Sequence, residues 1–168
     1  TPGELSCSAC QFTGRALRQS VTEVMPKRVK HKAKRRELVA SALQATGEKA
    51  VCHKSRFPKT VVKQNYTRQD GSEASTYRDL EDLRRAQGGT LTSKHFELAE
   101  GALANLVHIT QVCDVLLREL HGLMLEKMVA GTGRVYTDVS DNWLCVTAGK
   151  LCNKGEVGEA DEDEAEEL

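Results

Sequence analysis

Apolar residues fall at helical spacing in the first part of the chain. After Cys10, residues Leu17, Val21 and Val24 recur three or four positions apart, which predicts a helix with one buried face. Pro26 ends this helix, because the residue before a proline avoids helical backbone angles. The pattern therefore indicates an amino-terminal helix that stops shortly before residue 26.

A second apolar pattern predicts a helix from about Arg35 to about Lys54, with Gly47 as its weak point. Phe57-Pro58 breaks this helix. The two predicted helices are joined by a segment that is rich in basic residues and poor in apolar ones.

The next part of the chain changes character. Residues 60–68 are rich in β-branched side chains and read as extended, and Asp70-Gly71 is a turn signal, so a short hairpin is expected. A short helix is expected over residues 75–86, before the pair Gly88-Gly89.

The strongest helical pattern begins near Thr92 and continues for about ten turns. Thr92 or Ser93 could cap its start, and Gly131 could stop it. A stripe of this width is more typical of core than of a lipid cavity, so we expect it to be buried. Its members are Phe96, Ala99, Leu103, Leu106, Thr110, Cys113, Leu117, Leu120, Met124 and Met128.

The last predicted element covers about residues 137–151, and an acidic segment follows it. Residues 156–168 contain eight acidic residues and no basic ones, with almost no apolar side chains, so we expect residues 154–168 to be a disordered tail. The whole chain has 24 basic and 24 acidic residues, so the part before residue 156 carries 24 basic against 16 acidic residues.

Length and composition indicate a single domain with a modest core. Of the 168 residues, 39% are hydrophobic but only 4% are aromatic, so Leu, Val and Ala must form most of this core. No run of apolar residues is long enough for a transmembrane segment. The chain begins at Thr1 rather than Met, which suggests a processed amino terminus.

Six cysteines are arranged as two close pairs, at the two ends of the predicted domain, with two single cysteines between them. An even number at ordered spacing favours disulfides and an oxidising compartment, although fifteen pairings are formally open. A redox dithiol at the first pair is a weaker alternative, because two later cysteines at suitable spacing can occupy both thiols. A zinc site is also weaker, because the second pair is C-x6-C and the histidines are scattered. The cysteines are Cys7, Cys10, Cys52, Cys113, Cys145 and Cys152, and the histidines are His31, His53, His95, His108 and His121.

Several short motifs together resemble the canopy family of endoplasmic-reticulum proteins, which are elaborated saposin-like domains. About 60 residues separate the third and fourth cysteines, as in canopy proteins, whereas ordinary saposins have far fewer. The resemblance covers about residues 5–153. It is carried by Cys7-Ser-Ala-Cys10, Asn65-Tyr66-Thr67-Arg68 with Gly71 soon after, Cys113-Asp114, Leu144-Cys145 and Leu151-Cys152.

The resemblance implies an all-α, saposin-like helical bundle over residues 5–153, with an insertion between its two halves at about 57–91. It also implies three disulfides, namely Cys7–Cys152, Cys10–Cys145 and Cys52–Cys113. Two parallel bonds would then join the terminal helices, while the third would join two middle helices.

The same resemblance implies a non-catalytic binding module of the secretory pathway. Canopy proteins look like co-chaperones for secreted or membrane clients and regulators of receptor signalling. The alternatives are a saposin-type lipid-binding protein and a structural subunit of an extracellular assembly. The terminal Ala165-Glu166-Glu167-Leu168 departs from the usual retention signal in its basic and Asp positions, so both the reticulum lumen and secretion remain open.

A basic run between the first two helices is the main candidate for a partner surface. Nucleic-acid binders usually add aromatic residues or a recognisable module, and neither is present, so no nucleic-acid partner is expected. An anionic lipid or an acidic partner are alternatives to the favoured interpretation, a solvated segment between helices. The run consists of Lys27, Arg28, Lys30, Lys32, Lys34, Arg35 and Arg36.

Other chemistry is sparse. Asn65-Tyr66-Thr67 is an N-glycosylation sequon, which makes Asn65 a candidate glycoprotein site if the chain enters the secretory pathway. No nucleophile–base arrangement or phosphate-binding loop is recognisable, so we expect no enzyme and no cofactor. The acidic tail lacks the fixed ligand spacing of a calcium loop, and no metal is expected.

Overall fold

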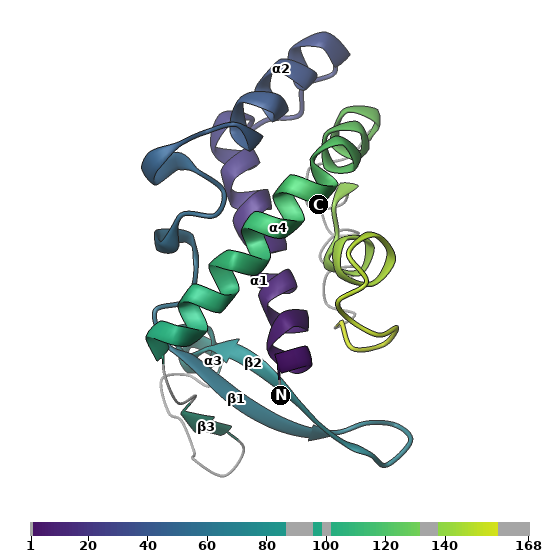
Figure 1. The fold of residues 1–168 in the computed structure, drawn as a ribbon. Coiled ribbons are helices and arrows are strands. Elements are labelled where there is room, and N and C mark those ends of the chain that lie inside the picture. Colours follow the sequence, from purple (N-terminus) through teal and green to yellow (C-terminus); the bar gives the residue numbers. More distant parts are fainter. Residues whose placement is uncertain (1, 87–95, 99–101, 132–137, 158–168) are drawn as a thin grey trace.

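Three long helices form the body of the protein in a computed structural model that describes residues 2–86, 96–98, 102–131 and 138–157. Helix α1 (Pro2–Val24), α2 (Lys32–Leu43) and α4 (Ala102–Ala130) pack against one another. Figure 1 shows α4 crossing α1, with α2 at one end of the molecule and a small sheet at the other. The fold is therefore mainly helical, as the sequence predicts.

The core lies where the apolar faces of these helices meet. Leu17 and Val21 of α1 and Val39 of α2 have no exposed surface, as expected from their spacing. From α4, the buried side chains include Ile109, Cys113, Leu116, Met124 and Met128. Of the predicted stripe within the described residues, Cys113, Met124 and Met128 are buried, and Leu106, Leu117 and Leu120 are partly buried against the core, which is the pattern expected of core.

The expectation of an all-α fold is wrong, because the middle of the chain forms a three-stranded antiparallel sheet. Strand β1 (Val61–Thr67) lies between β2 (Glu73–Asp79) and β3 (Phe96–Leu98). The expected hairpin is confirmed, and Gly71 has a φ of +86° in its turn, a conformation that glycine adopts without steric cost. This sheet occupies most of the predicted insertion at about 57–91, and β3 extends it to Leu98.

Strand β2 is joined to the helical body by a buried serine. The backbone N–H of Tyr77 donates a hydrogen bond of 3.0 Å to Oγ of Ser8 on α1. Ser8 is buried, and its hydroxyl lies 3.4 Å from that of Thr76. An unpaired N–H on a strand edge is costly when buried, so this contact both satisfies the edge and fixes the sheet on α1.

The second predicted helix is shorter than expected. It ends at Leu43, and short 3-10 turns over Gly47–Lys49 and Lys54–Arg56 replace its second half. Gly47 has a φ of +65°, which cannot continue a right-handed helix. The apolar residues that suggested a longer helix instead anchor a loop, since Val51 is buried in the core.

Two further helix boundaries differ from the sequence prediction because strand pairing overrides local helical spacing. Residues 75–79 belong to β2, so helix α3 covers only Leu80–Ala86. The long helix begins at Ala102 rather than near residue 92, and Phe96–Leu98 pairs with β1 instead. The suggested caps at 92 and 93 lie outside the described residues.

The carboxyl-terminal part of the described chain packs beside α1. Helix α4 ends before Gly131, as predicted, and Asn142–Ala148 form one π-helical segment, η3. Residues 154–157, which the sequence assigns to the tail, form a turn in which Glu156 is held by Asn153. The rest of the acidic segment, 158–168, lies outside the described residues.

Candidate functional site: a groove on a disulfide-braced scaffold

Three disulfides connect segments that are far apart in the sequence. Cys7–Cys152 and Cys10–Cys145 join α1 to the carboxyl-terminal segment, with S–S distances of 2.07 and 2.15 Å. Cys52–Cys113 joins the loop after α2 to the middle of α4, at 2.02 Å. This is the pairing that the resemblance to canopy proteins implies.

The pairing bears directly on the two other interpretations of the cysteines. Cys7 and Cys10 bond to partners at the far end of the chain and not to each other, and no cysteine is free. Bonded sulfurs offer no thiolate for exchange or for zinc. In the described part of the chain, no group of three or more His, Cys, Asp or Glu residues is placed to hold a metal ion.

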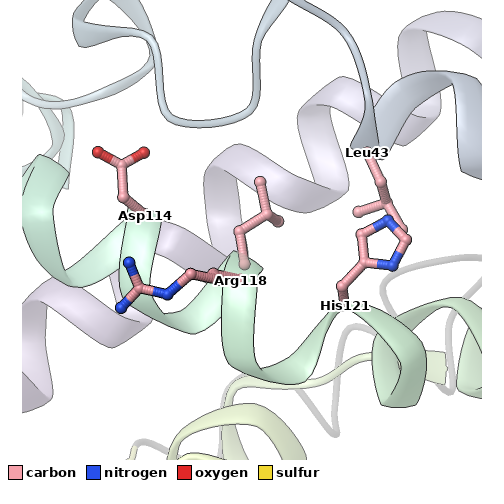
Figure 2. Close-up of a pocket in the computed structure, with 5 residues that line it drawn as sticks. Leu43, Asp114, Arg118 and His121 are labelled. Atoms are coloured by element: carbon pink, nitrogen blue, oxygen red, sulfur yellow. The ribbon is translucent and has the colours of Figure 1, made fainter.

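An open groove lies between the end of α2 and the middle of α4. Its volume is about 560 Å³, and it is lined by Leu43 of α2 together with Asp114, Leu117, Arg118 and His121 of α4. Figure 2 shows Leu43 directed toward the His121 ring, with Asp114 and Arg118 projecting from α4 on the groove side. The groove therefore combines an apolar floor with charged and polar groups along one helix.

Helical spacing explains why these groups meet. Asp114 and Arg118 are four residues apart on α4, as are Leu117 and His121, so each pair projects from the same side of the helix. The Cys52–Cys113 bond lies one residue before Asp114 and holds this part of α4 against the neighbouring loop. The groove thus has a covalently fixed wall.

The sequence indicated this site only in part. Cys113-Asp114 belongs to the motifs that carry the resemblance. The sequence places Leu117 in the predicted apolar stripe, and it assigns no role to His121 beyond being one of the scattered histidines. Leu117 is instead partly buried and faces the groove. Arg118 carries no sequence signal of its own, because an exposed arginine on a helix is ordinary.

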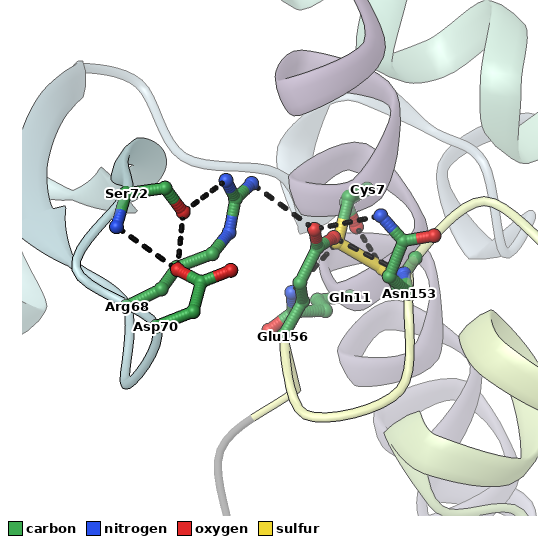
Figure 3. Close-up of polar contacts among 8 residues, drawn as sticks. Cys7, Gln11, Arg68, Asp70, Ser72, Asn153 and Glu156 are labelled. Atoms are coloured by element: carbon green, nitrogen blue, oxygen red, sulfur yellow. Dashed lines mark hydrogen bonds and ion pairs between the residues drawn. A yellow bond between two sulfur atoms is a disulfide. The ribbon is translucent and has the colours of Figure 1, made fainter.

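A second polar cluster joins the hairpin tip to the carboxyl-terminal segment (Figure 3). Arg68 Nη2 lies 3.4 Å from Glu156 Oε1, and the same carboxylate accepts hydrogen bonds from the backbone and side-chain nitrogens of Asn153. Nearby, hydrogen bonds from Ser72 lower the pKa of Asp70. The cluster lies beside Cys7–Cys152, so it braces the sheet against the disulfide-linked end of the body.

The seven basic residues between α1 and α2 do not form one uniform surface. Arg35 is buried and pairs with Asp138, while Arg36 pairs with Glu126 on α4. The expectation that all seven could bind an anionic lipid is therefore wrong for Arg35, whose guanidinium is inside the protein. The other five, Lys27, Arg28, Lys30, Lys32 and Lys34, are exposed.

The sequon lies on an outward face of β1. Asn65 and Thr67 are both exposed, and Asn65 Oδ1 accepts a hydrogen bond from Ser75 Oγ at 2.7 Å. Alternate residues of a strand share one face, so the two functional positions of the sequon are presented together. Glycosylation at Asn65 stays a prediction.

Comparison of the chain with protein-family models, with curated proteins and with solved structures finds no match. The resemblance to canopy proteins therefore stays a prediction from short motifs. In the described residues, no helix is long and apolar enough to cross a membrane. What the structure itself contributes is a mainly helical body with three disulfides, a docked sheet and an open groove between α2 and α4.

Proposed function

We propose that this protein is a canopy-like, non-catalytic binding module of the secretory pathway that assists a membrane or secreted client protein. The observation that carries the proposal is the groove of α2 and α4 on a scaffold held by three disulfides. Disulfides favour an oxidising compartment, either the reticulum lumen or the extracellular space.

The chemistry of the groove suits a protein segment better than a small substrate. Leu117, which is partly exposed, offers apolar contact beside the nearly buried Leu43, while Arg118 and His121 offer polar contacts at the rim. Protein interfaces typically combine an apolar centre with a polar rim in this way. No arrangement of nucleophile, base and oxyanion donors accompanies these residues in the described part of the chain, so the proposal involves recognition rather than catalysis.

Rigidity supports the same proposal. A surface that is preformed loses less conformational entropy when it binds than one that must order itself. Cys52–Cys113 fixes α4 immediately beside the groove, so the binding surface is maintained before the client arrives.

Site-specific photo-cross-linking in secretory cells tests the proposal. A photoreactive residue in place of Arg118 should capture a defined secretory or membrane protein under non-reducing conditions. The matched position is Arg84, which is exposed on α3. Capture of no protein, or of the same proteins from both positions, would contradict client binding at the groove.

Charge reversal supplies a second measurement. Arg118→Glu with His121→Glu changes two groove side chains without removing a buried group, so folding should be retained. We expect reduced client recovery from this variant and normal recovery from Arg84→Glu with Arg85→Glu. Equal recovery from both variants would exclude the groove as the client surface.

A further inference from the structure

Five exposed basic residues of the basic run remain once Arg35 and Arg36, which form ion pairs with Asp138 and Glu126, are set aside. We name them the basic strip: Lys27, Arg28, Lys30, Lys32 and Lys34. Among the ion pairs of the described residues, only Lys34 has an acidic neighbour, Glu37 at 3.7 Å, and both side chains are exposed. Such surface pairs contribute little, so within the described residues almost all of the strip's positive charge is uncompensated.

The local structure turns the strip outward. Val29 is partly buried and packs against the core, which anchors the loop between α1 and α2 at its centre. Arg28 and Lys30, on either side of Val29, are exposed. The core thus holds the loop, while its charged side chains remain in solvent.

The start of α2 adds to the positive potential. Lys32 and Lys34 lie in its first turn, and no acidic residue occurs there. The amino end of a helix carries a partial positive charge. The backbone N–H of Lys34 donates to the His31 ring at 3.4 Å, so the cap is provided by an imidazole rather than by a carboxylate.

Two classes of anionic partner, a membrane surface and a single-stranded nucleic acid, can be compared with the apolar and aromatic surroundings of the strip. Surface-bound membrane segments insert apolar side chains beside their bases, yet Met25 is buried and Val29 is turned inward, which leaves Val24 as the nearest exposed large apolar residue. Single-stranded nucleic acid is bound on aromatic platforms, and residues 25–43 contain no Phe, Tyr or Trp. The strip therefore lacks the aromatic side chains that a single-stranded nucleic acid would need, and it has little of the exposed apolar surface that a membrane would need.

We propose that the basic strip binds a sulfated polysaccharide of the heparin type. A run of closely spaced Lys and Arg without apolar or aromatic contacts suits a linear polyanion, which is bound mainly through its charge. Three disulfides favour the compartments in which such polysaccharides occur. The strip lies at the start of α2 and the groove at its end, so the inference is independent of client binding.

Heparin-affinity chromatography and titration with a heparin oligosaccharide test the proposal on the intact, oxidised chain. The strip variant is Lys27→Gln with Arg28→Gln and Lys30→Gln. The control is Lys59→Gln with Arg84→Gln and Arg85→Gln, which removes the same charge from exposed positions elsewhere. Equal melting temperatures will show that both variants fold.

The native protein should bind the oligosaccharide at about 0.15 M salt, where interactions between distant surface charges are largely screened. The strip variant should lose at least about tenfold in affinity, whereas the control should stay within about twofold. Desulfated heparin should not bind.

Four results would overturn the proposal. They are absence of binding at this salt, equal losses in the two variants, tighter binding of single-stranded DNA than of heparin, and strip-dependent binding of phosphatidylserine-containing vesicles that exceeds heparin binding. Equal losses in the two variants would reveal an effect of net charge alone. Tighter binding of DNA, or of the vesicles, would assign the strip to a nucleic acid or to a membrane instead.

Discussion

Arg35 and Asp138 form a buried ion pair between α2 and the segment after α4. The guanidinium Nη2 lies 2.5 Å from the carboxylate Oδ2, and the two side chains are only 3% and 8% exposed. Arg35 Nε also donates to the backbone carbonyl of Met128 near the end of α4. One arginine therefore connects α2 both to the end of α4 and to the segment that follows it, 93 and 103 positions further along the chain.

Removing one partner of this pair should be strongly destabilising. Arg35→Met leaves the Asp138 carboxylate without this cation, and we expect a loss of about 3–5 kcal/mol in the free energy of unfolding. Urea unfolding under non-reducing conditions measures it. Replacing both residues, as Arg35→Met with Asp138→Leu, should recover part of the loss.

The exposed pair of Arg36 and Glu126 is the matched control. It joins α2 to α4, at 2.7 Å, but its side chains are 48% and 63% exposed. Arg36→Met should therefore change the free energy of unfolding by no more than about 1 kcal/mol. If Arg35→Met and Arg36→Met lower the free energy of unfolding by similar amounts, burial does not determine the strength of the Arg35–Asp138 pair.

The Cys52–Cys113 bond can be removed by mutation while both terminal disulfides stay intact. Its entropic contribution to stability can therefore be measured separately. Its cysteines are separated by 61 positions. Closing such a loop stabilises the folded state by about 4 kcal/mol in the chain-entropy model. Cys52→Ala with Cys113→Ala should lower stability by about that amount, measured by urea unfolding.

The same bond should be the first to be reduced. Cys52 is partly exposed, whereas each of the other five cysteines is buried. A small reductant followed by alkylation and peptide mapping should label Cys52 and Cys113 before the others. The untreated protein should have an intact mass six hydrogens below that of the reduced chain, and early labelling of Cys7 or Cys10 would contradict this order.

Ser8 should matter for the attachment of the sheet. Ser8→Ala removes the acceptor for the Tyr77 N–H, and an unsatisfied buried donor costs about 1–3 kcal/mol. Amide hydrogen exchange should quicken at Tyr77 in particular. Ser41→Ala, on an exposed position of α2, should leave both stability and this exchange rate unchanged.

The pair of Glu23 and Arg56 predicts a dependence of stability on pH. Hydrogen bonds from Arg56 to both carboxylate oxygens, at 3.1 and 3.0 Å, lower the pKa of Glu23 from its ordinary value of 4.5. The folded state thus favours the carboxylate. Its stabilisation is fully present above pH 4.5 and is lost as the pH falls through the lower, folded pKa.

Melting temperatures at neutral and acidic pH test this direction. Glu23→Gln should melt below the native protein at neutral pH, and the difference should shrink as the solution is acidified past the folded pKa. Glu119→Gln, an exposed position on α4, is the control and should not reproduce this convergence. If the difference in melting temperature stays constant with pH, the Glu23 carboxylate is not the source of the pH-dependent stability.

Asn65 should carry an N-linked glycan when the chain is produced in a eukaryotic secretory pathway. Asn65 and Thr67 are exposed on one face of β1, so the modifying enzyme has access to the sequon. Mass spectrometry with and without deglycosylation measures occupancy. Asn65→Gln and Thr67→Ala should each abolish the mass difference, and an unchanged native mass would disprove modification.

The sequence by itself determined the helical body and the buried face of each long helix. Leu17, Val21, Met124 and Met128 are buried because apolar side chains at helical spacing have only one favourable side to face. Turn chemistry at Gly71 and the stop at Gly131 are equally local, so they too could be predicted. The cysteine count favoured disulfides but left fifteen pairings open, and the resemblance to a family implied one of them.

Only the tertiary structure decided which local preferences were overridden and which exposed residues meet. Residues 75–79 and Phe96–Leu98 became strands because pairing with β1 provides backbone hydrogen bonds that local spacing does not reveal. Arg35 and Arg36 are neighbours in one basic run, yet one is buried and the other is at the surface. The groove of α2 and α4 likewise depends on helix packing, because Leu43 and Arg118 are brought together across a long stretch of chain.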